Sequence, residues 1–147
     1  MQKELSEAEI TLLLHFCLLP NAEPYTKADL KEWLPPENSQ LWEDLGGMLT
    51  ALTHRGYLKT DGIGFSIHRL VTDIVWNKFN PKPESMEFLI EKISDLLSID
   101  QTKDNPVEKF AWISYGESIL SRYIHPQTPK ITRLQNNLAL VLKDLGD

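Results

Sequence analysis

The pattern of apolar and polar positions divides the chain into helical segments and one short extended segment. Over the first half of the chain, apolar residues recur at the three-and-four spacing of an amphipathic helix. This spacing predicts helices at about residues 6–19, 26–34 and 39–55, and a fourth helix over about residues 68–77. Between the third and fourth helices, YLKTDGIGFSI reads as two strands around an Asp-Gly turn, which is typical of a β-hairpin. Three helices followed by a hairpin and a further helix form a winged-helix arrangement.

The helix ends and the apolar stripes predict how this first part packs. Ser6 and Glu9 have the spacing of a capping box, and Gly56 suits the C-terminal glycine of the third helix. Gly46 and Gly47 lower the helix propensity within the third helix, so we expect another helix, the first one, to approach closely there. The positions expected to face inward are Ile10, Leu13, Leu14, Cys17 and Leu18, then Leu41, Leu45, Met48, Leu49 and Leu52, then Ile67, Leu70, Val71, Ile74 and Val75.

Beyond Asn80, the sequence is predicted to be purely helical. Two prolines within four residues, in Asn-Pro-Lys-Pro, indicate a module boundary. Helices are expected at about residues 84–98, 106–124 and 130–145. Their apolar stripes include Met86, Leu89, Ile90, Ile93 and Leu97 in the first of them and Leu134, Leu138, Val141, Leu142 and Leu145 in the last.

Composition and charge narrow the class of protein. The chain has 147 residues, 41% of them hydrophobic, and a net charge of −6. This acidic balance disfavours nucleic acid and anionic membranes as partners. The single cysteine, Cys17, allows no intrachain disulfide, and no apolar run has the length that a bilayer requires. With no recognisable signal peptide, we expect a cytoplasmic protein.

One stretch resembles a known signalling module. LGGMLTALTHRGYLKTDGIGFSIHRLVTDIV is similar to the winged helix that follows the nucleotide-binding core of STAND-class ATPases, the NB-ARC and NACHT-like proteins. The resemblance rests on the apolar pair of Leu49 and Leu52, on Gly56-Tyr57-Leu58, and on His68-Arg69-Leu70-Val71. The last of these resembles the Met-His-Asp signature of the family in a form familiar from bacteria. Ile67 stands in place of the Met, and Arg69 stands in place of the Asp.

The C-terminal stretch resembles a second family element. LQNNLALVLKDLGD is similar to the first helix of a TPR unit, with the match carried by Leu134, Asn137, Leu138, Ala139, Leu142, Leu145 and Gly146. One such helix cannot bury its own apolar face, because repeats of this kind are stable by stacking. The expected organisation is therefore a winged-helix domain at residues 1–80, a helical connector at 81–129 and the first helix of a TPR-like repeat at 130–147.

These resemblances imply a regulatory role without catalysis. The chain lacks the Gly-rich loop with Gly-Lys that cradles nucleotide phosphates, so no hydrolysis is expected of it. The family resemblance implies that a core binding ADP or ATP precedes this segment, that His68 contacts the nucleotide phosphate, and that the repeats bind a protein ligand. Arg69 is a second candidate at this site, although a solvated arginine at a helix start explains it equally well.

The candidate residues have other uses that also fit the sequence. His68 can serve as a helix cap or a partly buried histidine without binding anything. A stand-alone winged helix that binds DNA or acts as an adaptor is the alternative function, although the third helix offers only His54 and Arg55 as cations. His15 and Cys17 are two residues apart and face different sides of a helix, which does not suit a metal site. Trp112, with Tyr115 and Tyr123, is a candidate lining for a peptide groove, although packing is the simpler explanation.

Overall fold

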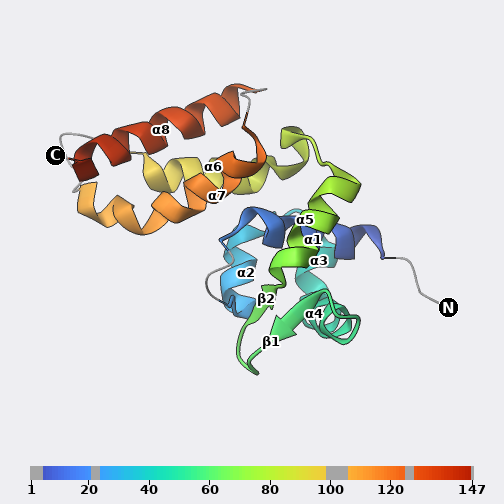
Figure 1. Cartoon of the computed structure of the whole chain (residues 1–147). Coiled ribbons are helices and arrows are strands. Elements are labelled where there is room, and N and C mark those ends of the chain that lie inside the picture. The colour runs from blue at the N-terminus through green and yellow to red at the C-terminus, as the bar shows by residue number, and fades with distance from the viewer. Residues whose placement is uncertain (1–4, 21–23, 99–105, 125–127, 147) are drawn as a thin grey trace. The chain divides into compact units, whose positions relative to one another are not determined.

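The structure, a computed structural model, describes residues 5–20, 24–98, 106–124 and 128–146 (Figure 1). It is mainly α-helical, with one short antiparallel hairpin after the early helices, as the sequence predicts. Contacts divide the chain between Pro81 and Lys82 into two compact units. Within the described residues, no helix is long and apolar enough to cross a bilayer.

The first unit begins with two helices whose starts are fixed by side chains. α1 covers Glu7–Leu18 and α2 covers Lys27–Trp33. Ser6 and Glu9 form the predicted capping box at α1, with the Ser6 hydroxyl accepting from the Glu9 N–H and the Glu9 carboxylate accepting from the Ser6 N–H. Thr26 and Asp29 form the same pair at α2. Each box satisfies two backbone donors that a helix start otherwise leaves unpaired.

The predicted third helix is two helices. α3 covers Ser39–Glu43 and α4 covers Leu45–His54, because Asp44 between them has non-helical angles, φ −113° and ψ 22°. The break places Gly46 and Gly47 in the first turn of α4. A Cβ on Gly46 would lie 3.2 Å from the Lys27 Nζ, and one on Gly47 would meet the Asp44 carboxylate. The expected close approach of α1 at these glycines is therefore wrong, since their neighbours come from α2 and from Asp44 itself.

The hairpin has the predicted place and turn. β1 covers Leu58–Thr60 and β2 covers Phe65–Ile67, antiparallel, with Leu58 opposite Ile67. Gly62 in the turn and Gly56 after α4 both have positive φ, 97° and 84°. Tyr25 adds an isolated bridge to Phe65, with N–H to carbonyl distances of 2.7 and 2.8 Å in the two directions. This bridge, the hairpin and the helices before it give the winged-helix arrangement.

The last helix of the first unit, α5, covers Arg69–Phe79 and packs on α1 (Figure 1). Its buried residues are Thr72, Val75 and Trp76. Leu70 and Ile74 are 79% and 67% exposed, so their predicted inward orientation is wrong. The physical reason is that α1 covers only one side of α5. Thr72 is polar but can be buried on the side facing α1, because its hydroxyl donates to the His68 carbonyl at 3.1 Å.

In its described residues, the second unit has three α-helices and two 3₁₀ segments. The 3₁₀ segments are η1 (Pro83–Met86) and η2 (Pro106–Trp112). The α-helices are α6 (Glu87–Leu97), α7 (Ile113–Arg122) and α8 (Pro129–Gly146). α8 lies along α6 and α7 (Figure 1). η1, α6, α7 and α8 thus contribute to one core, which includes Met86, Leu89, Ile90, Ile93, Leu97, Ile119, Ile131, Leu134, Leu138 and Val141.

The apolar stripe predicted for α8 is only partly buried, and α7 has a close contact that was not predicted. Leu142 is 40% exposed, so its predicted inward orientation is wrong, and the side chain of Leu145 lies outside the described residues. Gly116 of α7 permits a close helix crossing, because a Cβ there would lie 2.9 Å from the Leu97 Cδ1.

Candidate functional site

His68 occupies the junction between β2 and α5. The strand ends at Ile67, which is buried and paired with Leu58, and α5 begins at Arg69. His68 is the N-cap residue, with extended angles of φ −65° and ψ 137°, and its side chain makes no capping hydrogen bond. The imidazole is exposed and has no polar partner among the described residues. The ring is therefore available to a ligand or partner.

The backbone of His68, in contrast to its ring, is well anchored. Its carbonyl accepts from both the N–H and the hydroxyl of Thr72, at 3.0 and 3.1 Å. The Thr72 carbonyl in turn accepts a hydrogen bond from the thiol of Cys17 in α1, with a sulfur–oxygen distance of 3.6 Å. The position of the ring is thus tied to the core through α5 and α1.

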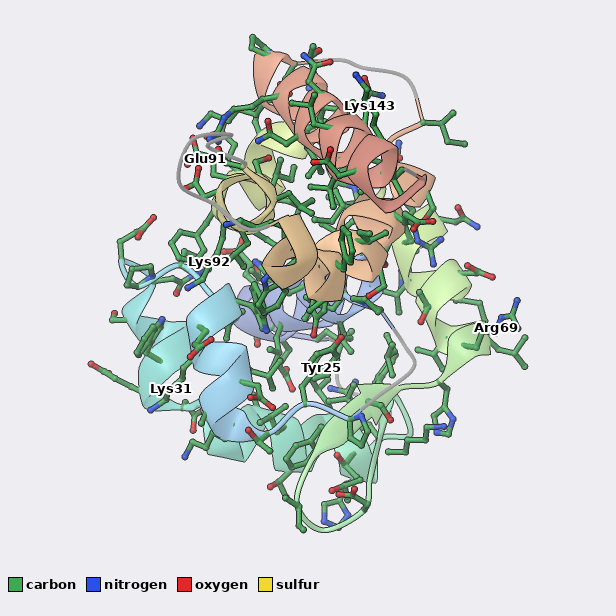
Figure 2. All side chains as sticks on the ribbon, turned by 90° about the vertical axis from the view of Figure 1, so that its left-hand side faces the viewer. Tyr25, Lys31, Arg69, Glu91, Lys92 and Lys143 are labelled. Carbon is green, nitrogen blue, oxygen red and sulfur yellow. The ribbon has the colours of Figure 1, made fainter. Side chains whose placement is uncertain are left out.

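Arg69 is the first residue of α5 and extends away from it (Figure 2). The side chain is exposed and, within the described segments, has no ion pair. His68 and Arg69 are consecutive in the chain and therefore lie together at the start of α5. An imidazole, a guanidinium and the free N–H groups of a first helical turn are all groups that interact favourably with an anion.

A second charged surface is relevant to the DNA alternative. Glu43 and Asp44 are exposed before α4, and with Glu7 and Glu9 they line an open hollow between the starts of α1 and α4. Exposed basic residues lie at the other end of α4, at His54 and Arg55, and on β1 at Lys59. One end of this surface would repel phosphate and the other would attract it. The basic end is small compared with the several phosphate contacts that a DNA duplex requires.

The turn of the hairpin is held by its own acidic residue. The Asp61 carboxylate accepts from the N–H groups of Gly64 and Ile63, at 2.7 and 2.9 Å. These bonds hold the pKa of Asp61 below its usual value, with the Gly64 bond contributing most. Asp61 therefore acts as a turn residue that keeps the hairpin loop in shape.

His15 and Cys17 both have partners of their own. His15 is buried in α1, and its Nδ1 lies 2.7 Å from the Thr11 carbonyl. Since a carbonyl only accepts, this nitrogen carries the proton. No cluster of three potential metal ligands occurs in the parts of the chain that the structure describes.

The three aromatic residues considered for a peptide groove either contact one another or are buried. Trp112 and Tyr115 contact each other edge to face, with ring centres 5.2 Å apart, and Tyr123 is buried. Burial, together with the charge of Glu84, raises the pKa of Tyr123 above its usual value. The packing role is therefore the better supported one for Tyr123.

Sequence reasoning missed one feature of this region. Leu70 and Ile74 stand exposed beside His68 and Arg69, although their apolar character and spacing predict burial. Apolar residues on two sides of α5 were the available signal, since the core can cover only one side.

Comparison with known proteins finds no matching family model, no similar curated protein and no similar solved structure. The assignment of a function therefore depends on the residues and their geometry.

Proposed function

We propose that this chain is a non-catalytic regulatory module of a bacterial-type STAND-class signalling ATPase. In this proposal, the winged helix senses whether an upstream core holds ADP or ATP, and passes that state to TPR-like repeats that begin with α8 and bind a protein ligand. The observation that carries the proposal is the exposed, uncommitted ring of His68 at the start of α5. Its support from the sequence is the resemblance of Gly56-Tyr57-Leu58 and His68-Arg69-Leu70-Val71 to the family pattern.

The proposed mechanism uses the difference between the free ring and the fixed backbone of His68. The imidazole would donate to a phosphate oxygen, and the first turn of α5 would add a favourable field. Arg69 is close enough along the chain to add a second donor. Because Thr72 and Cys17 connect the His68 backbone to α1, loss of the phosphate contact would release the winged helix as one rigid body.

The proposal is tested in the longer protein that contains the nucleotide-binding core. His68→Ala should weaken ADP retention and raise basal activity, since the phosphate contact would be lost. His54→Ala is a matched control, because His54 is also exposed in this unit but lies at the end of α4. Equal ADP retention and equal basal activity in the wild type and His68→Ala would refute the sensing role. A reading frame with no phosphate loop before this segment would refute the assignment to this class.

The alternative is a stand-alone winged helix that binds DNA or acts as an adaptor. The exposed basic residues His54, Arg55 and Lys59 favour it. A gel-shift assay with duplex DNA separates the two functions. Salt-sensitive binding that Arg55→Ala and Lys59→Ala weaken would support the DNA function, whereas the regulatory proposal expects no shift.

A further inference from the structure

The outer side of α5 carries an exposed apolar pair. Leu70 and Ile74 are four residues apart, so they lie next to each other on one face of the helix. Both are largely exposed, in contrast to Val75 and Trp76 on the buried side. An adjacent apolar pair of this kind on a helix of the first unit indicates a contact surface more strongly than isolated exposed residues do.

Two opposite charges lie along one flank of this pair. Arg69 and Asp73 are also four residues apart, and both are exposed. Arg69 extends outward from the helix start (Figure 2). The outer face of α5 thus combines an apolar centre, Leu70 and Ile74, with a positive group at Arg69 followed by a negative group at Asp73.

We propose that this face of α5 binds the same face of a second copy of the chain, with the two helices antiparallel. A twofold axis then places Leu70 of each copy against Ile74 of the other. In the antiparallel arrangement the same flanks meet, so Arg69 of each copy faces Asp73 of the other and two ion pairs form together. Asp73 can accept from a second donor while keeping interactions within its own chain, because a carboxylate has several acceptor sites.

The size of the surface sets the strength of this dimer. A stable interface buries roughly 800 Å² on each partner. A few side chains of the 11-residue α5 provide less, so the dimer should be weak and reversible. The net charge of −6 on each chain opposes it over longer distances. At about 0.15 M salt, charges more than about 8 Å apart are largely screened, which makes this a suitable condition for the test.

The dimer is tested by sedimentation of the whole chain over increasing concentration, up to about 1 mM, the level at which weak association becomes measurable. The average mass of the wild type should rise from monomer towards dimer. The double variant Leu70→Ser/Ile74→Ser should stay monomeric. Ile63→Ser removes an equally exposed apolar residue in the hairpin loop and should associate as the wild type does. A wild type that stays monomeric throughout, or a double variant that still dimerises, would overturn the proposal.

Charge variants test the antiparallel arrangement. Arg69→Glu and Asp73→Lys should each associate more weakly alone, because each places like charges opposite one another. An equimolar mixture of the two variants should regain association as a mixed dimer, since one copy is then negative at both positions and the other positive at both. A mixture that associates no better than either variant alone would refute this arrangement.

Discussion

His15 makes the stability of the first unit depend on pH. Burial lowers the pKa of this histidine, and the bond to the Thr11 carbonyl offsets the effect only in part. In the unfolded chain, the side chain regains an ordinary pKa of about 6.5. Below that pH, the unfolded state binds a proton that the folded state does not, so the free energy of unfolding falls as the pH falls. Above it, His15 is neutral in both states and makes no contribution to the pH dependence.

We expect His15→Gln to remove part of the acid destabilisation. Between about pH 6.5 and pH 5.5, His15 can lower the free energy of unfolding by at most about 1.4 kcal/mol per pH unit. Urea unfolding at pH 7.5 and pH 5.5 measures the difference for each variant. His54→Gln, which changes an exposed histidine in the same unit, is the matched control. An unchanged pH difference in His15→Gln would show that His15 does not titrate as its burial predicts.

The residues around His68 show what the sequence can predict of a site. The change from strand to helix at Ile67 and His68 follows from the pattern and is confirmed. The apolar residues on two sides of α5 signal that one side is exposed, but they do not identify the side of Leu70 and Ile74, because the sequence does not say which side α1 covers. Thr72 takes a buried position that its polarity argues against, since its hydroxyl bonds to the helix's own backbone.

At the scale of the elements, Asn137 joins α8 to α6. The Asn137 side-chain amide donates to the Ser94 carbonyl at 2.9 Å. Ser94 is in the last turn of α6, where the final carbonyls of a helix lack partners within it, and the Ser98 N–H bonds instead to the Asp95 carbonyl. Asn137 thus supplies a donor to a helix end that would otherwise lack one. This structural role accounts for Asn137 independently of the TPR resemblance.

Asn137→Ala should therefore destabilise the second unit. Loss of a hydrogen bond to a buried carbonyl costs about 1–3 kcal/mol of the free energy of unfolding. Asn136→Ala is the matched control, because Asn136 is the neighbouring residue but is exposed, and it should change stability by less than about 0.5 kcal/mol. Urea unfolding followed by circular dichroism gives both values. Equal stability of the two variants would contradict the proposed contribution of the Ser94 bond.

Element boundaries follow from the sequence where a side chain fixes them. The box at Ser6 places the start of α1 correctly, because it depends on two residues three positions apart, and Thr26 with Asp29 fixes the start of α2 by the same spacing. The break at Asp44 could not be predicted in the same way, since Leu41, Leu45 and Met48 continue one helical stripe across it. The stripe reports which residues are buried and not whether the backbone bonds between them are continuous.

At the scale of the whole molecule, the two units each have their own core. Leu12, Leu49 and Leu52 are among the fully buried residues of the first unit, and Leu89, Ile93 and Leu134 among those of the second. A unit with its own core and short connections can unfold cooperatively by itself. Trp33, Trp42 and Trp76 lie in the first unit and Trp112 in the second, so Trp112→Phe leaves a fluorescence signal from the first unit alone.

We expect variants in one unit to leave the unfolding of the other unchanged. Gly64→Ala should destabilise the first unit by about 1–3 kcal/mol, because overpacking forces the chain to shift. Its Cβ would lie 2.8 Å from the Pro24 Cβ and 3.3 Å from the Pro24 backbone carbon, beside the Tyr25 bridge. In the Trp112→Phe background, urea unfolding followed by fluorescence should therefore shift with Gly64→Ala and not with Asn137→Ala. If both substitutions moved this transition equally, the two cores would unfold as one cooperative unit, and a swing of the winged helix as a separate body would lose its physical basis.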